Sequence, residues 1–184
     1  GRTDAGVHAL AQVAHLDLTT SMPPESLMSR INDELPADIN ILRIEKVRHT
    51  FHARHSARSR SYVYQVARRR TAFAKPFVWW VKDDLDLRRM RAVAARLEGF
   101  HDFRAFSDDD PAQKSTTVQL TSLEIHEHGA LMVFRVVGSH FIWKMVRRLV
   151  GVIVEVGRSG LTTDEAVGML STDSELQAGL CPPA

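Results

Sequence analysis

Residues 141–156 constrain the fold most, because this segment is apolar on most sides of the helix that it predicts. Its apolar side chains recur both in phase with one helical face and out of phase with it (Met145, Leu149, Val152 and Val156; Val146, Val150 and Ile153). A helix that is apolar on most sides is packed inside a protein and does not lie on its surface. We therefore expect a buried helix late in the chain.

Two arginines, Arg147 and Arg148, lie in the first half of this helix, where the helix dipole disfavours cations. Arginine cannot lose its charge, so a buried arginine needs a partner, and a nearby carboxylate is expected. The alternative is that the side chains reach solvent along their aliphatic stems. We expect this for one of the two, since they lie about 100° apart around the helix.

The remaining elements mix helices and strands in irregular order. Helices are predicted over residues 21–35 and 85–97, and a Thr162-x-x-Glu165 capping box predicts a last short helix to about Leu170. Strands are predicted over residues 10–18, 39–47 and 60–66, and a hairpin over 116–126 and 130–137 with its turn at His128 and Gly129. Residues 101–112 are expected to form a loop.

The fold class that follows is α+β, because strands and helices do not alternate as they do around a parallel sheet. The length of 184 residues suits one domain or two small halves. We place the boundary in the irregular segment 71–84, which contains Pro76 and the Trp79-Trp80 pair. This gives an N-terminal half of residues 1–75 and a C-terminal half of residues 76–184.

The first nine residues, Gly-Arg-Thr-Asp-Ala-Gly-Val-His-Ala, form a polar segment with two glycines that places Asp4 beside Arg2 and Thr3. The apolar residues that follow it recur with a period of two. A loop held by a rigid strand is a common place for a catalytic carboxylate. The alternative is that Asp4 only stabilises a turn, for which aspartate is well suited.

Basic residues concentrate between positions 54 and 70, although the net charge of the chain is only +2. This stretch has no acidic residue and interleaves six arginines with His55, Tyr62 and Tyr64 (Arg54, Arg58, Arg60, Arg68, Arg69 and Arg70). Guanidinium groups pair with phosphates and aromatic rings stack on bases, so the pattern favours nucleic acid binding. A solvated basic strand edge is the alternative.

Other kinds of site receive little support. The histidines at positions 49, 52 and 55 and the Asp4–His8 pair lack the converging ligands of a zinc site, so a metal hydrolase is the weakest alternative. A single cysteine, Cys181, excludes an internal disulfide and fits a reducing cytoplasm. No apolar run approaches the roughly 20 residues that span a bilayer. Because the chain begins with Gly1 inside a motif, we expect a fragment.

Four stretches, in the same order, are similar to motifs of the tRNA pseudouridine synthase A family. They are residues 1–9, residues 51–64 (Phe-His-Ala-Arg-His-Ser-Ala-Arg-Ser-Arg-Ser-Tyr-Val-Tyr), residues 97–103 (Leu-Glu-Gly-Phe-His-Asp-Phe), and residues 141–151 (Phe-Ile-Trp-Lys-Met-Val-Arg-Arg-Leu-Val-Gly) with Glu155, Val156 and Gly157. The resemblance implies a mixed, largely antiparallel sheet with helices on one face and a central RNA-binding cleft. It also implies truncation at both ends.

The function implied by the resemblance is isomerisation of uridine to pseudouridine in the anticodon stem-loop of tRNA, around positions 38 to 40. Asp4 would be the nucleophile, Arg147 its charge partner, and Tyr62 the ring packed on the target base and a candidate for removing the C5 proton. Arg2 would contact RNA, and the basic stretch adds Arg54, Arg58 and Arg60.

The resemblance further implies a cytoplasmic homodimer that needs no cofactor or metal. Four residues depart from the usual family pattern, namely His55, Trp143, Lys144 and Arg148. The alternative function is a non-catalytic protein that binds tRNA or other RNA, or an inactive fragment.

Overall fold

The computed structural model describes residues 3–108, 112, 115–171 and 179–184. The chain forms two compact units, Gly1–Ala57 and Arg58–Ala184. In the described residues, no helix is both long enough and apolar enough to cross a membrane. The division that we expect between residues 75 and 76 remains a prediction, while the compact units place the strand over residues 60–66 in the second unit.

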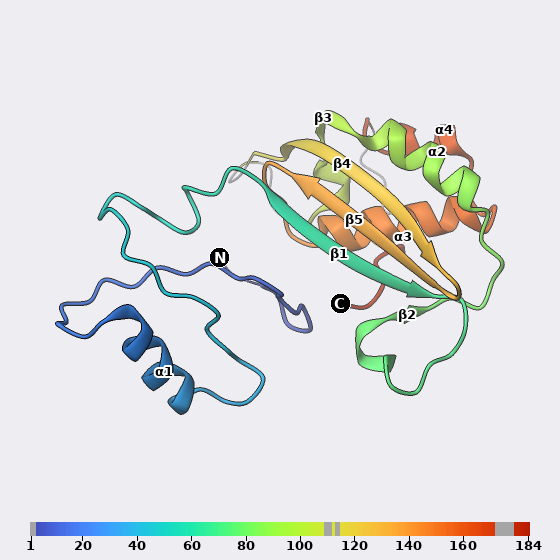
Figure 1. The fold of residues 1–184 in the computed structure, drawn as a ribbon. Coiled ribbons are helices and arrows are strands. Elements are labelled where there is room, and N and C mark those ends of the chain that lie inside the picture. The colour runs from blue at the N-terminus through green and yellow to red at the C-terminus, as the bar shows by residue number, and fades with distance from the viewer. Residues whose placement is uncertain (1–2, 109–111, 113–114, 172–178) are drawn as a thin grey trace. The chain divides into compact units, whose positions relative to one another are not determined.

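The second unit is built on a five-stranded sheet with the order β2-β1-β5-β4-β3 (Figure 1). The strands are β1 (Arg60–Ala67), β2 (Trp79–Trp80), β3 (Gly99–Asp102), β4 (Thr117–His128) and β5 (Leu131–Gly138). β2 runs parallel to β1, whereas the other three pairings are antiparallel. The predicted α+β class and the mixed, largely antiparallel sheet are therefore confirmed.

The predicted hairpin is formed by β4 and β5, and its turn includes Gly129 with φ 58°. Glycine adopts this left-handed conformation without the steric cost that a Cβ imposes. Buried and more exposed residues alternate along both strands, as expected for a sheet with one face on the core. In β1 the same alternation leaves Ser61 and Val63 exposed.

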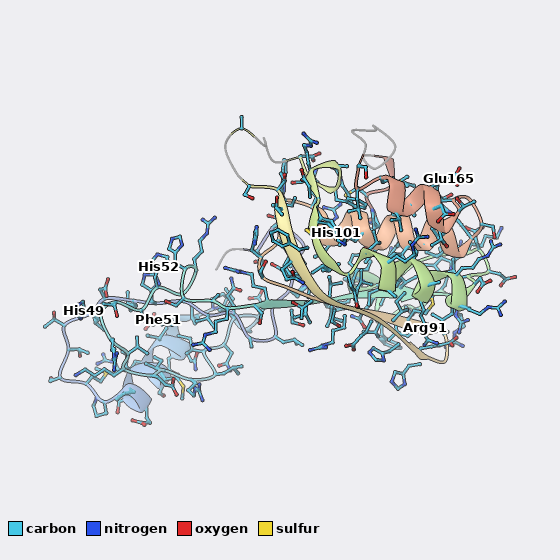
Figure 2. The ribbon with its side chains drawn as sticks, turned by 90° about the horizontal axis from the view of Figure 1, so that it is seen from above. His49, Phe51, His52, Arg91, His101 and Glu165 are labelled. Atoms are coloured by element: carbon cyan, nitrogen blue, oxygen red, sulfur yellow. The ribbon has the colours of Figure 1, made fainter. Side chains whose placement is uncertain are left out.

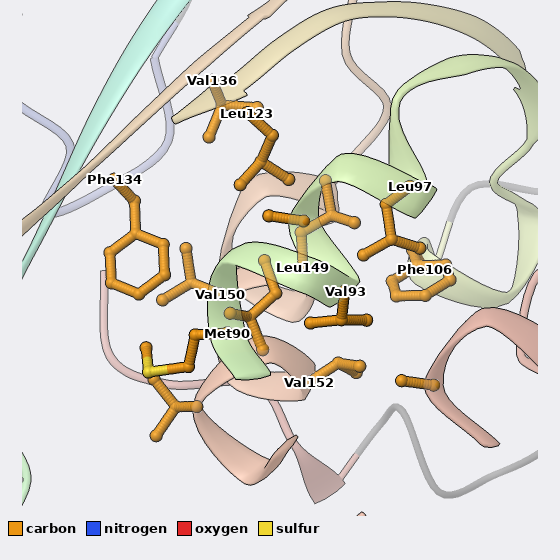
Figure 3. Packing of buried hydrophobic residues seen from close by; sticks show 14 of the residues in the cluster. Met90, Val93, Leu97, Phe106, Leu123, Phe134, Val136, Leu149, Val150 and Val152 are labelled. Carbon is orange, nitrogen blue, oxygen red and sulfur yellow. The ribbon is translucent and has the colours of Figure 1, made fainter. Parts of the chain in front are cut away.

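Helices α2 (Leu87–Leu97) and α3 (Met145–Gly157) pack on each other, and α2 also packs on β4 (Figure 3). In α3, ten of thirteen residues are buried, which confirms the predicted buried helix. Their side chains join Phe103, Phe106 and Phe134 in one hydrophobic core. On α2, Arg91 donates from Nε and Nη2 to the Ile125 carbonyl of β4, at 3.1 and 3.0 Å (Figure 2).

Helix α4 (Thr163–Gly168) begins with the predicted capping box. The Thr162 hydroxyl accepts from the Glu165 amide, and the Glu165 carboxylate accepts from the Thr162 amide. The described residues of this unit also include the 3-10 helices η1 (Lys75–Phe77) and η2 (Arg104–Phe106). The loop predicted over residues 101–112 is wrong in part, because β3 extends to Asp102 by pairing with β4 and η2 follows.

The first unit contains helix α1 (Pro24–Glu34), which confirms the predicted helix. The strands predicted over 10–18 and 39–47 are wrong, because the described residues of this unit form no strand. A period of two makes a strand only where a neighbour accepts its backbone hydrogen bonds. Ile41 instead bonds with the Asn32 side chain of α1, donating to Oδ1 at 2.7 Å and accepting from Nδ2 at 3.0 Å.

Candidate active site

Asp4 is an exposed residue of the first unit, at the start of a turn. Its carbonyl accepts a hydrogen bond from the Val7 amide at 3.1 Å, and Gly6 has φ 81°. A positive φ at the third residue of a four-residue turn is the usual place for glycine. Residues 4–7 of the first motif therefore form a turn that begins at Asp4, which leaves both the catalytic interpretation and the turn interpretation of Asp4 open.

Tyr62 is half-buried on β1, on the same face as Tyr64 and Val66. Its ring makes an edge-to-face contact with Phe141, with ring centroids 5.0 Å apart and an interplanar angle of 83°. Edge-to-face packing is a favoured arrangement of aromatic pairs. Phe141, in the segment just before α3, therefore fixes the orientation of the Tyr62 ring.

Arg147 is half-buried in the first turn of α3. Its Nε donates to the Pro182 carbonyl at 2.7 Å. The next carbonyl along the chain, that of Pro183, accepts from the Tyr64 hydroxyl at 2.6 Å. Burial raises the pKa of Tyr64 to about 12, while the charge of Arg147 acts to lower it. The side chains of Tyr64 and Arg147 thus meet at two consecutive carbonyls.

Arg148, rather than Arg147, is the buried arginine with a carboxylate partner. It is 5% exposed and pairs with Asp108, which also accepts from Lys144 Nζ at 2.6 Å. The hydrogen bond from Lys144 and the pairing with Arg148 lower the pKa of Asp108 against a smaller opposing effect of burial. Within the described residues, Arg148 Nε is buried without a hydrogen-bond partner.

Asp108 is the residue that the sequence analysis missed. The sequence predicts only a loop over residues 101–112, yet Asp108 in that loop supplies the carboxylate expected for a buried arginine. The sequence did indicate such a residue, because a buried arginine at position 147 or 148 requires a carboxylate close to it in space. The spacing could not identify which acid, because the pair spans 40 residues of sequence.

The predicted RNA-contact arginines have different surroundings. Arg2 lies outside the described residues. Arg54 is exposed in the first unit and Arg58 is exposed at the start of the second. Arg60 is half-buried, and its Nη1 donates to the Ser139 carbonyl at 2.8 Å, which ties β1 to the end of β5. Arg54 and Arg58 are therefore exposed to solvent, and Arg60 is partly committed to the fold.

A basic and aromatic surface lies beside β2. The Arg70 guanidinium sits 4.3 Å from the centroid of the Trp80 ring, and both residues line a shallow hollow with Thr71, Lys75 and Val78. Cation–π stacking of this kind holds the guanidinium over the ring. The combination of two cations with an indole is typical of surfaces that contact nucleic acid.

Three histidines of the first unit are in contact through tilted rings. The ring centroids of His15 and His52 are 4.5 Å apart, and those of His52 and His55 are 4.3 Å apart. His52 lies on the loop that also carries His49 and Phe51 (Figure 2). Burial and then the two neighbouring imidazoles lower the pKa of His52. In the part of the chain that the structure describes, no group of three or more His, Cys, Asp or Glu is arranged to hold a metal ion.

Two of the three predicted catalytic residues, Tyr62 and Arg147, belong to the second unit, and Asp4 belongs to the first. Within the second unit, Tyr62 shares its strand face with Tyr64, whose hydroxyl reaches the carbonyl next to the one that Arg147 contacts. An aromatic ring and a guanidinium are therefore presented from the same side of β1.

Comparison with known proteins gives the family. Residues 93–183 match a family model described as tRNA pseudouridine synthase, and residues 3–102 match a model described as an uncharacterized protein conserved in bacteria. The tRNA pseudouridine synthase A of Exiguobacterium sp. (strain ATCC BAA-1283 / AT1b) is 37% identical over the whole of this chain and 74% of its own length. That of Brucella ovis is 38% identical over the whole chain and 75% of its own length. The chain therefore belongs to the tRNA pseudouridine synthase A family, whose members are isomerases.

Proposed function

We propose that this protein isomerises uridine to pseudouridine in tRNA, with Asp4 as the nucleophile. The observation that carries the proposal is the identity of 37 to 38% with tRNA pseudouridine synthases A along the whole chain. In this reaction the bond between N1 and C1′ breaks and a bond between C5 and C1′ forms. A proton leaves C5 and N1 gains one, so the nucleotide keeps its composition.

Asp4 is suited to this role because a carboxylate can act as a covalent nucleophile and split one difficult step into two. It is exposed on a turn, which leaves its side chain accessible to a nucleotide. The attack is either on C1′ of the sugar or on the base, and both produce the same product. The proposal requires only that removal of the carboxylate stops the reaction.

Arg147 is the arginine that the family resemblance assigns as the charge partner of the nucleophile. What supports it here is its half-buried guanidinium, of which Nε is occupied by a carbonyl. The contact with Pro182 uses the Nε donor, and a carbonyl does not neutralise the charge. We propose that the two terminal nitrogens of the guanidinium receive the anion. Arginine presents these donors in a planar fork that matches a carboxylate.

Tyr62 is proposed to pack on the target uracil once that base has left its stack. Extruding a base costs a few kcal/mol, which stacking on an aromatic ring offsets in part. The edge-to-face contact with Phe141 supports this role, since a ring with a fixed orientation loses little entropy when a base packs on it.

The substrate contact is proposed to use Arg2, Arg54, Arg58 and Arg60, with the target on the 3′ side of the anticodon stem-loop, around positions 38 to 40. Each phosphate that an arginine neutralises releases counterions, so binding should weaken steeply with salt. A homodimer in the cytoplasm, with no cofactor, is the form in which we propose that the protein acts.

The test is to incubate unmodified tRNA with the protein and to map pseudouridine by carbodiimide labelling and primer extension. We expect product in the anticodon arm with the wild type, none with Asp4→Asn, and wild-type product with Asp17→Asn, an exposed aspartate of the same unit. Full product with Asp4→Asn would contradict the assigned nucleophile. Binding without product in the wild type would favour the non-catalytic RNA-binding alternative.

A further inference from the structure

Residues 180–184, which we call the C-terminal segment, lie against α3 and β1 in the second unit. Leu180 packs against the hydrophobic core, Cys181 is half-buried and Pro182 is buried. Three contacts fasten the segment, at Gly151, at Tyr64 and at Arg147. None of these contacts follows from the roles proposed above for Asp4, Tyr62 and Arg147.

The first contact depends on the absence of a side chain. A Cβ on Gly151 would lie 1.7 Å from the carbonyl oxygen of Leu180, so no other residue allows the segment this close to α3. Gly151 and Arg147 are four residues apart in α3, and residues with this spacing share one face of a helix. The segment therefore follows the same face of α3 from Gly151 to Arg147.

The second contact is the hydrogen bond from the Tyr64 hydroxyl to the Pro183 carbonyl at 2.6 Å. Residues 182 and 183 are both proline, which has no amide hydrogen, so neither can donate a backbone hydrogen bond to a neighbouring strand. Their carbonyls must instead accept from side chains. The phenol remains a donor throughout the neutral range, since it titrates only at high pH in this environment.

The third contact sets the orientation of Arg147. Its Nε donates to the Pro182 carbonyl at 2.7 Å, one residue before the carbonyl that Tyr64 holds. Because the guanidinium is planar, fixing Nε also fixes the directions of the two terminal nitrogens. A shift of the Pro182 carbonyl would therefore rotate the fork that Arg147 offers to an anion.

We infer that Tyr64 is a positioning residue for the isomerase reaction. Its hydroxyl fixes the C-terminal segment, whose Pro182 carbonyl aligns Arg147 for the charge that it must meet. This inference rests on the proposed function of Arg147. Gly151 contributes by permitting the approach of the segment to α3, and the inference assigns neither Tyr64 nor Gly151 a contact with the reacting nucleotide.

The test compares Tyr64→Phe with the wild type in kcat, in KM for tRNA and in the labelling rate of Cys181 by a thiol reagent. Cys181 is the only cysteine of the chain, so labelling reports on the C-terminal segment directly. Loss of one hydrogen bond should lower kcat about tenfold and speed labelling several-fold. KM should stay within about twofold, because Tyr64 has no role in binding the rest of the tRNA.

Gly151→Ala should also lower kcat and speed the labelling of Cys181, because its Cβ would displace the Leu180 carbonyl. Gly168→Ala is the matched control, since a Cβ at Gly168 meets nothing within 4 Å. It should leave both quantities at the wild-type value. If Gly151→Ala does not fold, Tyr64→Phe, which keeps the ring, decides the question.

Two results with Tyr64→Phe would overturn the inference. Unchanged labelling would show that the hydroxyl does not fasten the segment, and faster labelling with wild-type kcat would show that the segment does not align Arg147. Absence of synthase activity in the wild type is a different result. It would refute the proposed function, while Cys181 labelling would still show whether Tyr64 holds the segment.

Discussion

At the scale of single residues, Asp108 carries the counter-charge for two cations at the start of α3. Arg148 is buried and Lys144 is about one-third exposed, and both meet the same carboxylate. Charge-assisted hydrogen bonds are the stronger kind, and a buried arginine that loses its carboxylate keeps an uncompensated charge. Asp108 therefore stabilises the junction between η2 and α3.

We predict that Asp108→Asn destabilises the fold by about 3 kcal/mol, the lower end of the range for breaking a buried pair, because Asp108 itself is partly exposed. The unfolding free energy from urea denaturation measures the loss. Asp164→Asn is the matched control, since Asp164 pairs with Arg96 on the surface and such pairs contribute at most about 1 kcal/mol. Equal losses in the two variants would contradict the assigned role.

The same pair predicts a dependence on pH. Lys144 and then Arg148 hold the pKa of Asp108 below its ordinary value of 3.8. A depressed folded-state pKa contributes stability that is fully present above the unfolded pKa and is lost as pH falls through the folded pKa. The difference in unfolding free energy between the wild type and Asp108→Asn should therefore be constant at neutral pH. It should shrink below about pH 4, and a constant difference down to pH 2 would contradict this.

At the scale of elements, the capping box at the start of α4 contributes measurably to the stability of the fold. The Thr162 hydroxyl accepts from the Glu165 amide at 3.2 Å, which satisfies one of the free amides at the start of the helix. We predict that Thr162→Ala costs about 1 kcal/mol, while Thr162→Ser retains most of the stability. The urea midpoint with an unchanged slope measures this. A similar loss in both variants would show that packing of the methyl group, rather than the cap, is responsible.

The elements that the sequence predicted correctly are those whose signals are local. The distribution of apolar residues around the helix predicts α3, and the capping box predicts the start of α4. Alternating apolar residues and a turn glycine predict the β4–β5 hairpin. The strands predicted over residues 10–18 and 39–47 failed because a strand depends on a partner that periodicity does not specify. Leu10 and Leu16, in phase for a strand, are 92% and 71% exposed.

The site could be predicted less completely than the fold. The expected carboxylate is present, but it pairs with Arg148 and not with Arg147. The side chains of Arg147 and Arg148 point to different sides of α3, and Arg147 contacts the Pro182 carbonyl instead. The contacts of Arg147 with Pro182 and of Tyr64 with Pro183 could not be predicted. The first contact joins residues 35 positions apart and the second joins residues 119 positions apart. Both acceptors are backbone carbonyls, which every residue has, so the residue types do not indicate these contacts.

At the scale of the whole molecule, the hydrophobic core belongs to the second unit. Every residue of the core cluster lies between Val66 and Met169, and among the described residues of the first unit only Ala53 is buried. Regions with few buried apolar contacts open more readily than the core. The two units should therefore differ in local stability.

We predict that amide hydrogen exchange is slowest in β1, β4, β5 and α3 and much faster throughout residues 3–57. Mass spectrometry of peptides after exchange at neutral pH measures this for both units in one experiment. Protection in α1 equal to that in α3 would contradict the prediction. It would show that the first unit is stabilised as strongly as the second without a comparable buried core.

The most direct test of the proposed activity is tritium release from tRNA labelled with [5-³H]uridine, with tRNA binding measured in the same sample. Release follows the loss of the C5 proton and so reports the isomerisation itself. We predict release by the wild type and none by Asp4→Asn, with both proteins binding tRNA. Release by Asp4→Asn at the wild-type rate would contradict the nucleophile, and bound tRNA without release by the wild type would contradict the isomerase.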